Sequence, residues 1–264
     1  MTEIFAKSQI NNLRQIFANT ANKSGVSFDF LLKTATRESS MQPDARSKTS
    51  SAAGLFQFVE QTWLSMISKY GQVYGLATEA DAIKRNENGK FVVKDPIARN
   101  KILNLRHDPV VSTAMAAQLT LDNREQLSAK IGRKPNDAEL YVAHFMGVSS
   151  AGSLLNAATT TPDIAASKLF PVEAKANQAF FFDNKGKSRS VSDVAWKLQS
   201  LHLDGFSADN VSGVSSSGES GKLATAFPLA SAMVRAPLMQ LSPMLIRLLS
   251  ELSLPSSKIF EDEK

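Results

Sequence analysis

The chain contains no cysteine among its 264 residues, so disulfide bonds and thiolate metal sites are excluded. Histidine is also scarce: His107, His144 and His202 are far apart, and their separations do not match the spacing of metal ligands. No apolar run is long enough to cross a bilayer. The first residues lack the basic start and apolar core of a secretory signal peptide. We therefore expect no metal site, no membrane span and no visible signal peptide.

The composition is that of a soluble globular protein, with 43% hydrophobic and 21% charged residues. A formal net charge of +5 favours approach to polyanions. The positive charges are scattered along the chain and do not form a stripe or an arm. Nucleic acid is therefore not an expected partner.

An acidic residue, Glu38, ends the apolar face of an expected helix. Leu31 and Ala35 precede it at the spacing of one side of a helix. Burial disfavours the charged form of a carboxyl group, and a general acid that works near neutral pH needs this property. A glutamate at a helix end is, however, more often an exposed cap or a member of an ion pair, and Arg37 is adjacent. Position alone leaves both interpretations open.

The residues around Glu38 form two ordered blocks. The first contains Glu38-Ser39, Pro43-Asp44-Ala45 and Ser47; the second contains Gly54-Leu55-Phe56-Gln57 and is followed by Thr62. Together they resemble the signature of the lytic transglycosylases of the SLT type, in the lysozyme-like superfamily. Phe56 stands where methionine is usual in that signature, and the loop between the blocks is slightly longer than usual.

A third block of that family, Ala-Tyr-Asn-Ala-Gly, has a degraded counterpart in residues 139–147. If its first alanine and its glycine are aligned with Ala143 and Gly147, His144 takes the tyrosine position and no gap is needed. Aligning tyrosine with tyrosine selects Tyr141 instead. In either register Tyr141 and His144 share one helix face, because they are three residues apart. With this block, the resemblance covers residues 25–160.

The resemblance implies an enzyme that cleaves the β-1,4 bond between N-acetylmuramic acid and N-acetylglucosamine in peptidoglycan, without a cofactor. Glu38 would act first as general acid and then as base, leaving 1,6-anhydro-N-acetylmuramic acid ends. The implied substrate-binding residues are Ser39, Gly54, Leu55, Gln57, Phe58, Tyr141 and His144. The implied location is the periplasm or the cell envelope.

Two other functions stay open. A hydrolytic muramidase on the same fold would want a second carboxylate, for which Asp44 and Glu139 are the candidates next to the motifs. A non-catalytic wall-binding scaffold module would keep the fold but would normally lose the acid, and Glu38 is present.

The expected fold is mainly α, of the α+β lysozyme-like kind, with at most a small β-hairpin near residues 86–93. Ser27 is the expected N-cap of the helix that leads to Glu38, and Trp63 is expected in the core. We expect a catalytic domain over residues 1–170 and a packed extension over 171–206. Residues 207–264 contain a Ser/Gly-rich linker and an apolar, proline-interrupted tail. This tail is expected to be flexible, to dock on an envelope-spanning machine or a membrane surface, or to fold back on its own domain.

Overall fold

The computed structural model describes residues 2–48 and 50–203, so the linker and tail expected over 207–264 lie outside the described residues. The helices are α1 (Thr2–Ser24), α2 (Phe28–Ser39), α3 (Glu60–Tyr70), η1 (Gly71–Tyr74), α4 (Ala77–Ala82), α5 (Pro96–Asn104), η2 (Leu105–His107), α6 (Pro109–Ile131), α7 (Asp137–Met146), α8 (Val148–Thr160), α9 (Ala166–Leu169), α10 (Pro171–Ala176), α11 (Gln178–Phe181) and α12 (Val191–Leu203). None of these helices combines the length and the apolarity needed to cross a membrane.

A short antiparallel hairpin is the one named sheet of the described chain. Its strands are β1 (Lys84–Arg85) and β2 (Phe91–Val92), in the register that pairs Lys84 with Val92. The Asn86 side chain closes the turn, because its Oδ1 accepts hydrogen bonds from two backbone N–H groups of the loop. The expectation of a mainly α fold with a small hairpin is confirmed.

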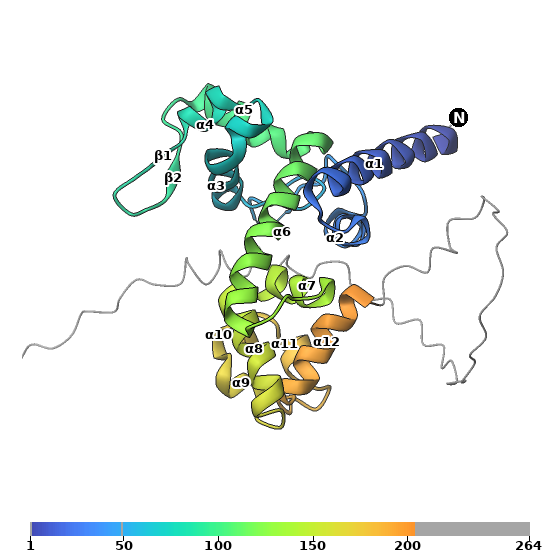
Figure 1. Cartoon of the computed structure of the whole chain (residues 1–264), viewed down its shortest axis with the longest axis vertical. Helices are drawn as coiled ribbons and strands as arrows, with labels where there is room; N and C mark the ends of the chain where they lie inside the picture. The colour runs from blue at the N-terminus through green and yellow to red at the C-terminus, as the bar shows by residue number, and fades with distance from the viewer. Residues whose placement is uncertain (1, 49, 204–264) are drawn as a thin grey trace, which may run out of the picture.

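The buried apolar residues form two clusters, which we call the upper and the lower core. The upper core lies among α1, α2, α3 and the start of α6, and the lower core lies among α8, the later helices and the end of α6. Figure 1 shows α6 running from one half of the molecule to the other. Helix α7 also contributes to both cores, with Leu140 and Tyr141 in the upper one and Val142 and Phe145 in the lower one. These two helices therefore hold the halves together.

Helix α2 forms where the sequence predicts it. The side chain of Ser27 caps its start by accepting a hydrogen bond from the Phe30 backbone N–H at 3.3 Å. Leu31 and Ala35 are fully buried in the upper core, as their spacing predicts. The helix ends where Ser40 adopts the left-handed conformation. The buried face of α2 therefore leads directly to Glu38.

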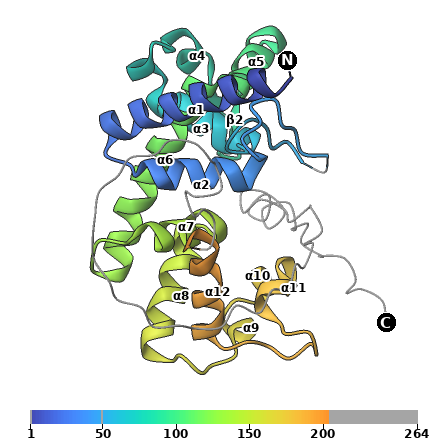
Figure 2. The same cartoon turned by 90° about the vertical axis from the view of Figure 1, so that its right-hand side faces the viewer.

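Residues 171–203, which fall in the expected packed extension, also contribute to the lower core. Phe181, Val191 and Leu198 lie in the lower core. The end of α12 reaches α2, where Arg37 Nη2 donates a hydrogen bond to the Leu201 carbonyl at 2.5 Å. The neighbouring His202 packs its ring near those of Phe30 on α2 and Tyr141 on α7. Figure 2 shows this meeting of α2, α7 and α12.

Candidate active site

Glu38 and His144 meet between the two halves of the molecule, although 106 residues separate them in the chain. The Nε2 atom of His144 on α7 lies 3.0 Å from Oε1 of Glu38 at the end of α2. The Glu38 side chain is 5% exposed and the His144 side chain is 10% exposed. A carboxyl group this well shielded from water needs a polar partner, and the imidazole supplies it.

The chemistry of the two groups fixes the sense of this hydrogen bond. An ionised carboxylate has no proton to give, so His144 Nε2–H is the donor and Oε1 is the acceptor. The same bond persists when Glu38 is protonated, provided that the proton sits on Oε2. Among the described residues Oε2 has no hydrogen bond or ion pair. One oxygen is therefore anchored by His144, and the other has no protein partner among the described residues.

Tyr141 forms an apolar wall beside this pair. Its ring is buried, 5.8 Å from the His144 ring between centroids, and the Arg37 guanidinium lies 5.7 Å from its centroid. Burial, and then the negative charge of Glu38, raise the pKa of Tyr141 well above its usual value. The phenol therefore stays neutral. Of these two residues, His144 makes the hydrogen bond to Glu38.

The backbone is strained on both sides of the site. Among the described residues, the non-glycine residues with positive φ are Ser40 at 52°, Met41 at 64° and Gln57 at 46°. The first two follow α2 directly after Glu38-Ser39, and the third lies in the second motif block. Left-handed backbone costs about 1–2 kcal/mol per non-glycine residue, and such strain is typically concentrated at functional sites. The loop shape here is therefore imposed by its surroundings.

The Gln57 amide holds this loop together. Its Nε2 donates hydrogen bonds to the carbonyl of Gly54 at 2.9 Å and to that of Ala45 at 3.3 Å. The resemblance implies that Gln57 contacts sugars and that Gly54 lets backbone approach them. In the structure the close neighbour of Gly54 is the Arg106 carbonyl: a Cβ atom on Gly54 would lie 1.9 Å from that oxygen. Gln57 thus ties the loop to itself, and Gly54 packs the loop against η2.

Two residues of η2, Arg106 and His107, contact backbone carbonyls of the motif loop. The buried Arg106 side chain donates from Nη1 to the carbonyls of Ser51 at 2.5 Å and Phe58 at 3.0 Å. Burial lowers the pKa of Arg106, although a guanidinium still keeps its charge at neutral pH. His107 Nδ1 lies 2.9 Å from the Pro43 carbonyl. Sequence reasoning missed both residues, because they follow a separate helix and carry no motif of their own.

Three other implied substrate-binding residues occupy structural positions. Leu55 and Phe58 are buried in the upper core, where Phe58 packs edge-on against the fully buried Trp63. The Ser39 hydroxyl donates to the Ala35 carbonyl at 3.0 Å. Ser39 therefore keeps only its acceptor lone pairs for Glu38 or a substrate. Trp63 itself is a core residue, as predicted, and its Nε1 donates to the Ile102 carbonyl at 2.7 Å.

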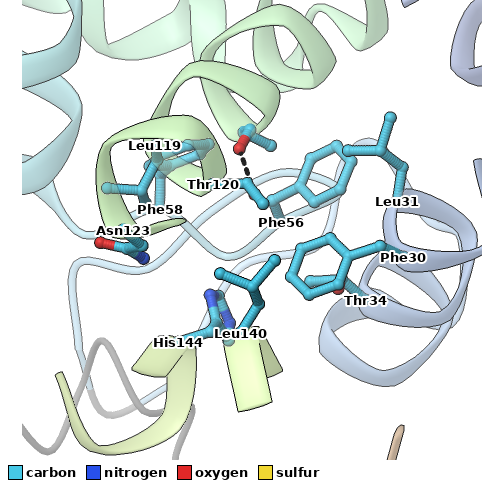
Figure 3. Close-up of a pocket in the computed structure, with 11 residues that line it drawn as sticks. Phe30, Leu31, Thr34, Phe56, Phe58, Leu119, Thr120, Asn123, Leu140 and His144 are labelled. Atoms are coloured by element: carbon cyan, nitrogen blue, oxygen red, sulfur yellow. Dashed lines mark hydrogen bonds between the residues drawn. The ribbon is translucent and has the colours of Figure 1, made fainter. Parts of the chain in front are cut away.

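A small pocket of about 10 Å³ has the His144 side chain in its wall (Figure 3). Its walls are mainly apolar and come from α2, the second motif block, α6 and α7. Its polar side chains are Thr34, Thr120, Asn123 and His144. Sequence reasoning missed Thr34, although it stands one helical turn before Glu38 and so shares its side of α2.

The two candidates for a second carboxylate differ in their surroundings. Glu139 is buried: its carboxylate binds both Nη atoms of Arg133, at 2.8 and 2.6 Å, and accepts from the Asn136 backbone N–H in a capping box. The hydrogen bond from Arg133 lowers the pKa of Glu139. Asp44 is exposed in the motif loop. The Glu139 carboxylate therefore stabilises the start of α7. Among the described residues, no three His, Asp or Glu side chains gather as metal ligands would.

Residues 15–84 match the family model described as the transglycosylase SLT domain. The resemblance seen in the motifs is thereby confirmed over this segment, which contains Glu38 and both motif blocks. The match supports peptidoglycan cleavage of the transglycosylase or lysozyme type. The block around His144 lies outside the matched segment, and the structure alone places it at the site.

Proposed function

We propose that this protein is a lytic transglycosylase that cleaves the bond between N-acetylmuramic acid and N-acetylglucosamine, with Glu38 as its acid and base. One observation carries the proposal. Glu38, at the Glu-Ser position of the matched segment, is shielded from water and anchored through a single carboxylate oxygen by His144. This arrangement suits a group that must present one oxygen, in one place, in both protonation states.

In the first step protonated Glu38 gives its proton from Oε2 to the glycosidic oxygen. The bond from that oxygen to C1 of the muramic acid breaks, and N-acetylglucosamine leaves with a hydroxyl group. In the second step the carboxylate removes the proton of the muramic acid 6-hydroxyl. The freed oxygen attacks C1 and closes the 1,6-anhydro ring. Glu38 ends protonated, as it began, and no water is consumed.

The role of the second carboxylate separates this reaction from hydrolysis. A hydrolase of the two-carboxylate type uses its second group as nucleophile or to activate water. Glu139 is already bound by Arg133 and by the Asn136 backbone. The intramolecular 6-hydroxyl removes the need for such a group. We infer that the protein acts in the periplasm or elsewhere in the envelope, where its substrate is.

The test is mass spectrometry of muropeptides released from purified sacculi. We expect the wild-type protein to release products with anhydro ends, which are one water lighter than reducing ends. Glu38→Gln keeps the size of the side chain and an oxygen that accepts from His144, but it cannot donate an acidic proton. We expect it to fold normally and to release nothing.

The other outcomes identify the competing functions. Reducing ends from the wild-type protein would establish a muramidase, and Asp44→Asn would then test the exposed candidate carboxylate. Sacculi that bind the protein and release nothing would indicate a scaffold module. Wild-type activity in Glu38→Gln would overturn the assignment of the acid.

A further inference from the structure

The hydroxyl group of Thr34 is buried and has no partner among the described residues. Thr34 is 2% exposed and lies on α2, one turn before Glu38. A buried hydroxyl without a hydrogen bond has lost its bonds to water without gaining any in exchange, so native proteins rarely leave one unsatisfied. This group therefore needs an explanation.

The other buried threonines of the described helices show the usual arrangement. Thr113 and Thr120 on α6 both turn their hydroxyl groups back to the carbonyl four residues earlier, at 2.5 and 2.8 Å. The half-buried Thr36 on α2 does the same with the Leu32 carbonyl at 2.8 Å. This bond is the default for a helical threonine. Thr34 departs from it, and its side chain lines the pocket that His144 closes.

That pocket is about the size of one water molecule. Its volume of about 10 Å³ is close to the least that holds a water molecule. A buried water also needs two to four polar partners. Thr34, His144 and Asn123 line the space (Figure 3), and the hydroxyl of Thr120 keeps its acceptor lone pairs. Size and polarity together fit water better than any part of a sugar.

We propose that this pocket is a binding site for a single structural water, held by the Thr34 hydroxyl and the His144 imidazole. The only hydrogen bond of this imidazole among the described residues is the one from Nε2 to Glu38. A water that donates to Nδ1 keeps the proton on Nε2, since the partner of one ring nitrogen decides the tautomer. Thr34 is thus a positioning residue, which acts on Glu38 through the water and His144.

The role in positioning rests on the proposed function, whereas the water site itself does not. Two measurements therefore separate them. The first is a crystal structure of the full chain without substrate, at a resolution that shows ordered water. We expect density within hydrogen-bond distance of Thr34 Oγ1 and the His144 ring. We expect the same density to be absent from Thr34→Val, which keeps the shape of the side chain without the hydroxyl.

The second measurement is the steady-state cleavage of sacculi by matched variants. We expect Thr34→Val to lower kcat about tenfold with little change in KM, because a small misplacement of a catalytic group costs rate. Thr34→Ser restores the hydroxyl and should restore kcat. Thr113→Val removes a buried hydroxyl that does not line the pocket, and it should keep wild-type rates.

Each departure from these results has a defined meaning. A pocket without density in the wild-type crystal would overturn the water site. Density together with wild-type kcat in Thr34→Val would overturn the positioning role. If the wild-type protein cleaved nothing, the proposed function would fail, and the density would still decide the water site.

Discussion

Gly54 offers a direct test of how the motif loop is built. It has a φ of +80°, and an added Cβ atom would lie 1.9 Å from the Arg106 carbonyl oxygen and 2.8 Å from its carbon. Gly54→Ala therefore adds two costs, about 1–2 kcal/mol for left-handed backbone and about 1–3 kcal/mol for overpacking. We expect a loss of about 2–5 kcal/mol in the free energy of unfolding, a large part of a typical 5–15 kcal/mol.

Gly132 is the matched control for this substitution. Its φ is +71° at the end of α6, and a Cβ atom there would meet nothing within 4 Å. Gly132→Ala should therefore lose only the backbone cost of about 1–2 kcal/mol. Urea titration of both variants, followed by the fluorescence of the buried Trp63, measures the difference. Equal losses in the two variants would refute the contact between Gly54 and η2.

Two further predictions concern Glu139 and His202. Glu139→Gln should lower the free energy of unfolding by about 1–3 kcal/mol. The folded variant should keep the specific activity of the wild-type enzyme. If activity is lost while stability is unchanged, Glu139 is again a candidate for the second carboxylate. Because Arg133 lowers the pKa of Glu139, this difference in stability should shrink as the pH falls below about 4. Burial, and then the charge of Lys33, lower the pKa of His202 in the folded protein. Below a pH of about 6.5 the unfolded chain therefore binds more protons at His202 than the folded chain does. The wild-type protein should lose stability as the pH falls below that value. His202→Phe should weaken that dependence between pH 8 and pH 5 in urea titrations; identical pH profiles would contradict the assignment to His202.

Local structure around the site was predictable because it depends on neighbours in the sequence. Ser27 caps α2 through a hydrogen bond three residues away, and Leu31 and Ala35 are buried at the spacing of a helix face. Trp63 is in the core, and the turn near Asn86 closes a hairpin. Each of these features follows from hydrophobic spacing or from the hydrogen-bonding habits of one side chain.

The roles of several motif residues were not predictable from their positions. Gln57 and Gly54 belong to a block that the resemblance assigns to sugar binding. In the structure, however, the Gln57 amide donates to the Gly54 carbonyl within the loop, and the Gly54 backbone lies against Arg106. The glutamate of the third block, Glu139, is taken up by Arg133. Such partners come from other segments, and no local rule indicates which of them a side chain will find.

The sequence by itself determined that Glu38 ends an amphipathic helix next to a recognisable pair of motif blocks, and residues 15–84 match the corresponding family. Only the tertiary structure decided which residue of the degraded third block reaches Glu38. Packing of α7 against α6, α8 and α12 brings His144 to 3.0 Å from the carboxylate and leaves Tyr141 beside it. Which of the two residues faces Glu38 depends on how α7 is rotated about its axis between the upper and lower cores. That rotation is set by contacts between segments far apart in the sequence, such as Glu38 and His144, which are 106 residues apart.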